Sequence, residues 1–336
     1  MPTELSDSPG PGVFPSPPRP ATAARSDVLL ELTHGLRAEL LRRGEYLPGG
    51  WVEEAANDLK AGRLRGWVLD GGDDPRGLAF FSPRKGRAYG HAHVTAGPDS
   101  LARMRQLLDA LRSSLPTPGA RLDVGVTGLA DEEEAALGNG LVSSRGESAV
   151  VRLALEVAVS AGAPVALPDG LQPVAIRTIP LESLATLDWT SFQGTPDQSL
   201  VADTPADDAH VLEEILRGLL GRFLDEASTG LADARGELLG FLLTAEQTPR
   251  RAIFLDLVIR PTSRGQGLGR YLLTWGMRAL SALGYETARL WVTESNVVAR
   301  RLYDELGFQP KGRALIVRFQ GDERATASPP QPHRSR

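Results

Sequence analysis

Hydrophobic residues in the second half of the chain fall into short apolar runs and amphipathic stretches, which predict alternating strands and helices. The expected strands cover residues 230–233, 238–244, 251–259, 288–293 and 314–319. The expected helices cover residues 211–225, 269–283 and 297–306. Gly284 and Gly307 follow the last two helices, where glycine commonly ends a helix. Strands that alternate with helices indicate an α/β fold with a mixed central sheet.

A weak internal repeat divides the chain. Three pairs of segments resemble each other in the same order, at a nearly constant offset of about 165 residues. Their first residues are Gly77 and Gly240, Arg121 and Arg289, and Gly140 and Gly307. One such match arises easily by chance because apolar strands look alike, but three collinear matches favour a duplicated unit.

The repeat gives the expected domain organisation. The first copy spans residues 26–158, the second spans residues 174–319, and the proline-punctuated residues 159–173 link them. Residues 1–25 and 320–336 are rich in proline and small or polar residues, which is typical of disordered tails. The first tail has no basic start followed by an apolar stretch, so it does not resemble a signal peptide.

Composition and charge narrow the functional classes. The chain has 336 residues, enough for two domains that each bury a core. Its formal net charge of -5 gives no electrostatic reason to expect nucleic acid or an anionic membrane as a partner. No apolar run approaches the roughly 20 residues that cross a bilayer, so we expect a cytoplasmic protein. Cysteine is absent, which excludes disulfides, thiolate metal sites and a covalent acyl-cysteine intermediate.

A glycine-rich turn leads from the expected strand 251–259 into the next helix. Its residues are Arg264, Gly265, Gln266, Gly267, Leu268 and Gly269. A helix N-terminus offers unpaired N–H groups and a partial positive charge, and glycines leave that backbone open to an anion. The spacing differs from the G-x-G-x-x-G of dinucleotide-binding folds, and the Lys-Ser/Thr of a P-loop is missing. By itself the turn fits either a phosphate site, to which Arg264 adds a cation, or a simple glycine-rich turn.

A second cluster of residues lies on the short helix after the strand 288–293. Asn296, Ala299 and Tyr303 follow one face of that helix. The glycine turn, followed by N-x-x-A-x-x-x-Y, closely resembles the GCN5-related N-acetyltransferase (GNAT) superfamily, although the family's Arg-x-x-Gly-x-Gly motif is met loosely. The resemblance implies two tandem GNAT-like domains with the acyl-CoA N-acyltransferase fold, and acetyl-CoA as the cosubstrate.

The resemblance also implies roles for individual residues. Backbone N–H groups of the glycine turn would bind the pyrophosphate, and the pantetheine arm would bond to strand backbone where residues 256–259 and 290–293 splay apart. Asn296 would meet the pantetheine. Tyr303 would protonate the departing thiolate, and the alternative is a half-buried structural tyrosine. The expected cofactor-binding residues are Leu257, Val258, Ile259, Arg264, Gly265, Gln266, Gly267, Leu268, Gly269, Arg270, Asn296, Ala299 and Tyr303.

The general base is the least specified role. The second copy holds a single histidine, His210, at the expected start of its first helix, which favours a carboxylate or a relayed water. Asp256 interrupts an otherwise apolar strand, where a charge needs a partner or water. It fits a base beside the acetyl group and, equally, a structural acceptor for neighbouring N–H groups. Glu294, beside the second splayed strand, is the reserve candidate.

The first copy lacks these motifs. The segment HVTAGPDSLARMRQLL stands where the second copy has its glycine turn, and no residue matches Asn296 or Tyr303. Residues 26–158 are therefore expected to be a degenerate copy that does not bind acetyl-CoA in the usual way and that shapes the acceptor cleft. His91 and His93 alternate along one strand face without a third ligand, so no metal is expected.

The expected activity is acetyl-CoA-dependent N-acetylation of a primary amine, by direct attack in a ternary complex. The acceptor is a small-molecule amine or a protein amino group. The acidic residues 195–208 weakly favour a cationic amine, and their alternative is a solvated loop. A non-catalytic acyl-CoA-binding sensor or interaction module and an aminoacyl-tRNA-dependent transferase are the alternative functions; the intact glycine turn and the lack of a basic stripe argue against the latter. We expect a monomer, with a homodimer as the alternative.

Overall fold

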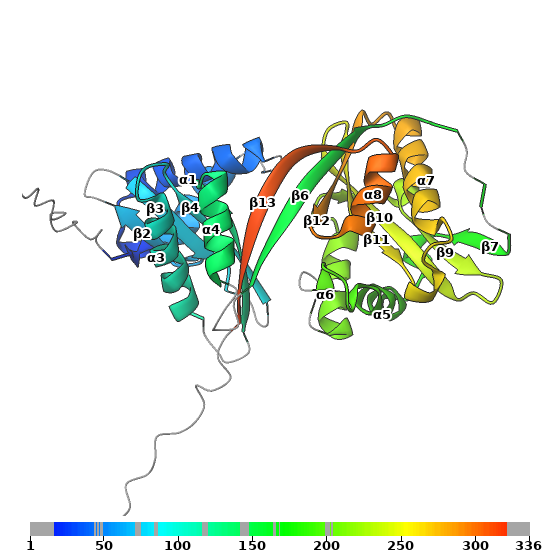
Figure 1. Ribbon diagram of the computed structural model, residues 1–336, viewed down its shortest axis with the longest axis horizontal. Helices are drawn as coiled ribbons and strands as arrows, with labels where there is room; N and C mark the ends of the chain where they lie inside the picture. Colours follow the sequence, from blue (N-terminus) through cyan, green and yellow to red (C-terminus); the bar gives the residue numbers. More distant parts are fainter. Residues whose placement is uncertain are drawn as a thin grey trace, which may run out of the picture. The chain divides into compact units, whose positions relative to one another are not determined.

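The computed structural model describes residues 17–320, apart from residues 44, 46, 48–49, 71–74, 84–86, 116–119, 142–147, 164–165, 168, 199–201 and 203. The chain forms two compact units (Figure 1). The first unit contains the described residues of Met1–Glu39, Pro48–Ala149 and Ile316–Arg336, and the second contains those of Leu40–Leu47 and Val150–Leu315. No described helix is both long enough and apolar enough to span a membrane.

The first unit is built around strands in the order β1-β2-β3-β4-β5, with β4 and β5 parallel and the other neighbours antiparallel. The strands are β1 (Arg19–Pro20), β2 (Arg65–Asp70), β3 (Pro75–Phe81), β4 (Arg87–Val94) and β5 (Arg121–Thr127). The helices are α1 (Ser26–Arg42), α2 (Trp51–Lys60), α3 (Ser100–Ser113) and α4 (Asp131–Leu141), and the short turn η1 covers Ala21–Ala23. Helix α3 packs against β2, β3 and β4.

The second unit is built around strands in the order β6-β12-β11-β10-β9-β7, with β8 paired to β10. Its strands are β6 (Ser148–Ala158), β7 (Leu171–Val174), β8 (Arg222–Phe223), β9 (Thr229–Asp233), β10 (Leu238–Thr248), β11 (Arg251–Ile259) and β12 (Thr287–Thr293). Its helices are α5 (Leu181–Phe192), α6 (Pro205–Leu216), α7 (Leu268–Ala282) and α8 (Val297–Glu305). Short turns cover η2 (Ile176–Thr178), η4 (Asp225–Ala227) and η5 (Pro261–Ser263). The last strand, β13 (Gln309–Gln320), is divided between the units after Leu315.

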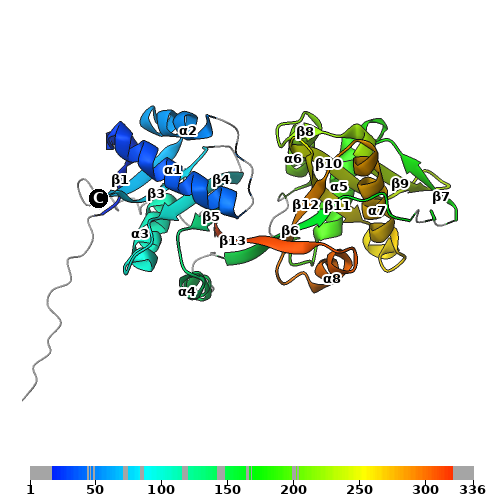
Figure 2. The ribbon, with the colours of Figure 1, turned by 90° about the horizontal axis from the view of Figure 1, so that it is seen from above.

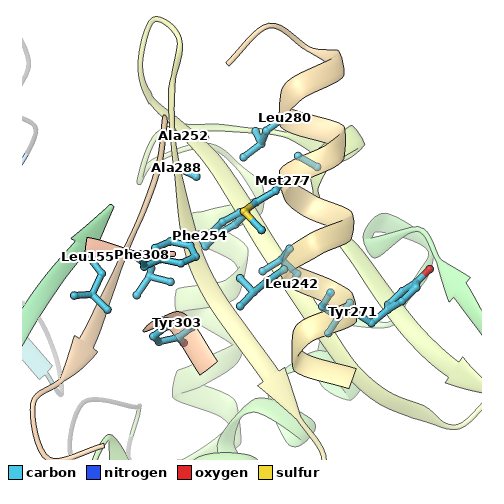
Figure 3. Packing of buried hydrophobic residues seen from close by; sticks show 14 of the residues in the cluster. Leu155, Leu242, Ala252, Phe254, Tyr271, Met277, Leu280, Ala288, Tyr303 and Phe308 are labelled. Atoms are coloured by element: carbon cyan, nitrogen blue, oxygen red, sulfur yellow. The ribbon is translucent and has the colours of Figure 1, made fainter. Parts of the chain in front are cut away.

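Helices cover the part of the sheet that belongs to the second unit (Figure 2), and one apolar core packs on each of its two faces. Side chains of β10 alternate between them, because Leu242 joins one cluster while Phe241 and Leu243 join the other. The first cluster packs α7 and α8 on the sheet, and its members include Leu155, Phe254, Leu272, Met277, Tyr303 and Phe308 (Figure 3). The second packs α5 and α6, and its members include Leu184, Leu187, Leu212, Ile215 and Val258.

The structure corrects the expected helix over residues 211–225. Helix α6 begins six residues earlier, at Pro205, where Thr204 caps it by accepting a hydrogen bond from the Asp207 N–H, and it ends at Leu216. Gly218 and Gly221 follow with φ of 81° and 116°, a left-handed backbone that ends the helix before β8. Helix α5 had no predicted counterpart.

Strand β6 is placed differently from the expected boundaries. Residues 148–158 were assigned to the first copy, yet β6 pairs antiparallel with β12, from Arg152–Thr293 to Ala158–Thr287. Alternate side chains of β6, including Leu155, pack into the α7 cluster of the second unit. The second unit therefore takes a strand that the repeat assigned to the first copy.

The ends of the predicted segments also shift. Residues 1–16 and 321–336 of the expected tails lie outside the described residues. Residues 17–25 do not continue the expected tail, because Arg19–Pro20 pairs with β2 and a short turn follows. Part of the expected linker forms β7, which pairs with β9 through backbone hydrogen bonds.

Candidate active site

Strands β11 and β12 separate along their length. Their parallel pairing joins residues 251–253 to residues 287–289 and, within the described chain, goes no further although both strands continue. The equivalent strands of the first unit, β4 and β5, stay paired over residues 87–93 and 121–127. The predicted splaying is therefore confirmed in the second unit, and the first unit has no such gap. The gap leaves two facing strand edges without a partner strand, as a ligand with an extended amide arm requires.

A β-bulge in β11 sets the direction of Asp256. The register with β10 skips Leu255, which is the extra residue. Side chains of a regular strand alternate, so without the bulge Asp256 would share the face of Phe254 and enter the α7 cluster. The bulge instead places Asp256 on the face of Val258, which packs with α5 and α6.

Two buried carboxyl groups meet Asp256 on this face. Asp188 on α5 and Asp208 on α6 are only 4% and 3% exposed. Asp188 lies within hydrogen-bonding reach of both Asp208 and Asp256. Burial, followed by the negative charge of Asp208, raises the pKa of Asp256 to about 7. Burial and the two neighbouring carboxylates raise the pKa of Asp188 well above its usual range. A carboxyl group that titrates near neutrality is suited to proton exchange with an amine.

Tyr303 lies in the α7 cluster, on the opposite face of the sheet. It is 8% exposed, and its ring centroid is 5.7 Å from that of Phe308, which Figure 3 shows beside it. Burial and the negative charge of Asp197 raise the pKa of Tyr303, while the positive charge of Arg152 lowers it. The phenol is therefore held protonated at neutral pH, as proton donation requires.

The glycine turn has an open, left-handed backbone. Gly265 and Gly267 have φ of 77° and 79°, and a Cβ atom on either would meet nothing within 4 Å. Gly267 immediately precedes α7, whose first turn has no side-chain cap and no acidic residue. The first N–H groups of α7 are thus available to an anion. Gly269 has a different role, because its Cβ would lie 3.2 Å from Leu302 of α8.

Side chains fix the ends of this turn. The Arg264 guanidinium donates to the backbone carbonyl oxygens of Ser191, at the end of α5, and of Ile259, at 3.4 Å in the second case. Arg270 forms an ion pair with Glu305 on α8. Arg264 and Arg270 thereby connect the turn and the first residues of α7 to helices on both faces of the sheet.

Asn296 and Asp197 form the centre of a polar network next to the gap. Asn296 accepts a hydrogen bond of 3.1 Å from the Ala299 N–H, which caps α8, and its amide nitrogen donates to Asp197 at 2.5 Å. Thr293 Oγ1 donates to the other oxygen of Asp197, and Arg152 Nη1 lies 3.7 Å from it. Asn296 thus caps α8, and both ends of its side-chain amide are bonded to other residues of the protein.

The remaining predicted residues differ in their surroundings. Leu257, Val258 and Ile259 belong to the part of β11 that is not paired with β12. Leu268 is 2% exposed and belongs to the core beneath the turn, whereas Gln266 is exposed. Glu294 has an exposed side chain, and its backbone N–H donates to Val151 of β6 at 2.8 Å. The carboxyl cluster therefore gathers around Asp256 and not around the reserve candidate.

The comparisons with known proteins agree with this geometry. Residues 181–308 match the acetyltransferase (GNAT) family. A mycothiol acetyltransferase of Frankia casuarinae is 31% identical over 267 residues, which cover 74% of this chain and 70% of that protein. A mycothiol acetyltransferase of Thermomonospora curvata is 30% identical over 259 residues, which cover 76% of this chain and 82% of that protein. The chain belongs to the GNAT family of acetyltransferases.

Solved structures extend the likeness of this GNAT acetyltransferase to both units. A GCN5-related N-acetyltransferase from Sphaerobacter thermophilus superposes with a TM-score of 0.58 at 15% identity, covering 91% of this chain and 95% of that one. A tandem GNAT protein from the clavulanic acid biosynthesis pathway gives a TM-score of 0.55 at 18% identity, covering 90% and 97%. The fold is therefore a tandem GNAT arrangement, as predicted.

Four residues of this site had not been singled out from the sequence. Asp188 lies on the helix without a predicted counterpart, and Arg152 lies on the strand that had been assigned to the first copy. Asp197 and Asp208 belong to the acidic residues 195–208, whose alternative was a solvated loop; both are buried, whereas Asp207 is exposed. The polar residue Asp188 within the apolar run LESLATLDWTSF was the available signal.

Proposed function

We propose that this GNAT acetyltransferase transfers the acetyl group of acetyl-CoA to a primary amine of a small molecule, by direct attack in a ternary complex held by the second unit. The observation that carries the proposal is the gap between β11 and β12. It opens beside the glycine turn and is flanked by Asp256 on one face of the sheet and Tyr303 on the other.

The residues at the gap fit acetyl-CoA as the cosubstrate. The backbone of Gly265 and Gly267 borders open space at the uncapped start of α7, where a pyrophosphate gains N–H donors and a favourable helix dipole. Arg264 lies beside this space and adds a cation. The facing edges of β11 and β12 supply the backbone partners that the amides of a pantetheine arm need. When bound, acetyl-CoA supplies the thioester that an amine attacks.

Asp256 and Tyr303 divide the proton transfers. Asp256 accepts a proton from the ammonium form of the acceptor, and the freed amine nitrogen forms a C–N bond to the thioester carbonyl carbon. The C–S bond then breaks, and Tyr303 donates its phenolic proton to the departing sulfur. The nitrogen gives up its second proton, which restores Tyr303, so the net reaction releases one proton to solvent through Asp256. A peptide N–H near Val258 or Ile259 stabilises the oxyanion.

The acceptor is proposed from two observations. The relatives at 30% and 31% identity are mycothiol acetyltransferases, which supports a small-molecule amine over a protein amino group. The acidic face around Asp256 supports an amine that arrives as a cation. A non-catalytic sensor would not need a paired acid and base. An aminoacyl-tRNA-dependent transferase would not need the glycine turn.

Two measurements test this function together. Isothermal titration of the full-length protein with acetyl-CoA is expected to give one site per chain, because β4 and β5 of the first unit stay paired. Thiol release in the presence of a panel of primary amines is expected to exceed release without an amine. Two acetyl-CoA sites would contradict the degenerate first copy, and binding without amine-dependent release would leave the sensor as the function.

A further inference from the structure

The carboxyl cluster around Asp256 draws on three separate elements. Asp188 comes from α5, Asp208 from α6 and Asp256 from β11, and α5 packs against both of the other elements. The bulge at Leu255 is what directs the β11 carboxylate toward the two helices. A regular strand would have kept the three groups apart, so local backbone geometry and helix packing together create the cluster.

Two oxygens in this region lack a hydrogen-bond donor. Asp188 Oδ1 is buried and accepts no hydrogen bond from the described residues. Ser191 lies one turn further along the same face of α5, is 2% exposed, and its Oγ also has no partner within that part of the chain. Buried acceptors are normally paired, and an unpaired one destabilises the folded state. A bound molecule that carries N–H donors would pair both oxygens.

The charges that act on the cluster are mainly negative. Asp256 faces Asp188 and Asp208 from the two helices and Asp197 from the loop between them. Arg152 of β6 acts on Asp256 as a cation, but its guanidinium lies 3.7 Å from Asp197. A ligand that brings a positive charge and several N–H donors satisfies both the charge and the unpaired oxygens.

We propose that Asp188, with Asp208 and Ser191, forms an ammonium-binding subsite beside Asp256, and that the acceptor is a primary amine whose neighbouring groups are neutral or cationic. This inference rests on the proposed function. An ammonium group offers three N–H donors, one for Asp256 and two for the neighbouring oxygens. A carboxylate attached close to the amine is repelled by the same cluster, so the subsite excludes free amino acids.

The role of Asp188 is positioning. It holds the ammonium nitrogen next to Asp256 and takes no part in bond formation. Because the two carboxyl groups lie within hydrogen-bonding reach, Asp188 also shares the proton that Asp256 removes from the acceptor. The acceptor nitrogen is thereby kept on the α5–α6 face of the gap, opposite Tyr303.

A binding experiment tests the subsite without requiring turnover. The full-length protein is saturated with CoA, which has no acetyl group to transfer, and titrated calorimetrically with β-alaninamide, β-alanine and 1,3-diaminopropane. The three probes share an aminoethyl group. They differ in the group attached to it, which is a neutral amide in β-alaninamide, a carboxylate in β-alanine and a cationic aminomethyl group in 1,3-diaminopropane. We expect β-alaninamide and 1,3-diaminopropane to bind at least about tenfold more tightly than β-alanine, equivalent to about 1.4 kcal/mol.

Matched variants identify the residue responsible. Asp188→Asn is nearly isosteric and is expected to weaken β-alaninamide about tenfold while the affinity for CoA stays unchanged. Glu182→Gln removes the same charge from an exposed position on the same helix and is expected to change neither affinity. Asp208→Asn is a second variant of the cluster and should weaken the amine in the same direction.

The outcomes separate this inference from the proposed function. Equal binding of β-alanine and β-alaninamide, or unchanged amine binding in both Asp188→Asn and Asp208→Asn, overturns the subsite even if the enzyme acetylates amines. Charge-selective amine binding that needs Asp188 supports the subsite even if no thiol is released. The absence of thiol release would contradict only the proposed acetyl transfer.

Discussion

Arg152 of β6 is the register partner of Thr293, the last residue of β12. The Thr293 hydroxyl donates to Asp197, and the Arg152 guanidinium lies 3.7 Å from the same carboxylate. Arg152 also acts electrostatically on Tyr303, whose pKa its charge lowers. A strand that the repeat assigned to the first copy thus brings a cation to the gap between β11 and β12, so residues 174–319 do not hold the whole candidate site.

Removing β6 is expected to destabilise the second unit. Residues 152–158 pair with β12 along seven register positions, and Leu155 is 2% exposed in the α7 cluster. A fragment of residues 159–320 keeps β7 but leaves that strand edge and that apolar surface open. We expect it to lack a cooperative thermal transition by circular dichroism, whereas residues 148–320 retain one. Equal melting of the two fragments would show that β6 is dispensable.

Gly267→Val is expected to abolish acetyl-CoA binding. The side chain fills the open space above the turn, and the position has φ of 79°, which disfavours a β-branched residue. Gly284→Val is the control, since its φ is 80° and its Cβ position is also open, but it lies at the far end of α7. Calorimetry should show at least a tenfold loss of affinity for Gly267→Val alone. A similar loss in both variants would trace the effect to backbone strain.

The pH dependence of catalysis is expected to follow Asp256. This group must be deprotonated to accept a proton, and its pKa is raised to about 7. The kcat/KM of the native enzyme should therefore rise as the pH increases through about 7. Asp256→Asn should lose about 100-fold or more in kcat and lose that limb of the profile. Glu294→Gln, at an exposed position, should keep the rise of kcat/KM through about pH 7. A native-like pH profile in Asp256→Asn would show that Asp256 is a structural acceptor and not the base.

Stability should also depend on the carboxyl cluster, with a defined sign. Folding raises the pKa of Asp188 and of Asp256, so the folded protein holds protons that the unfolded chain releases above about pH 4. Stability is therefore expected to fall as the pH rises from 4 through 7. Asp188→Asn removes part of this dependence, and its thermal midpoint should exceed that of the native protein at pH 8 but not at pH 4. A constant difference across this range would rule out proton linkage at Asp188.

Periodicity and glycine placement predicted the elements around the gap well. The expected bounds of β11, α7, β12 and α8 agree with the structure to within one residue at each end, because apolar runs and the glycines at 284 and 307 mark them. Their order along the chain places the glycine turn and Tyr303 beside the gap between β11 and β12. The placement of these two features follows from local sequence.

The rest of the site depends on tertiary relationships that local sequence does not contain. The face of Asp256 is set by the bulge at Leu255, and no residue pattern in IFLDLVI marks that bulge. The sequence repeat identified β6 as a copy of β13 but held no information on which sheet β6 joins. Arg152 and Asp188 therefore entered the site only with the structure.

Tyr303→Phe is expected to separate the proton donor from the structural tyrosine. The ring packs against Phe308 at 5.7 Å, and phenylalanine keeps that contact, so the free energy of unfolding should change little. Loss of the hydroxyl should lower kcat about 100-fold, since the thiolate then leaves without a proton. Tyr271→Phe is the control, because Tyr271 has the same 8% exposure in the same cluster but lies on α7. Acetyl-CoA affinity should be unchanged in both. Because an activated thioester such as p-nitrophenyl thioacetate carries a leaving group that needs no proton, Tyr303→Phe should approach native turnover with it; an equal defect with both acyl donors would assign Tyr303 to packing.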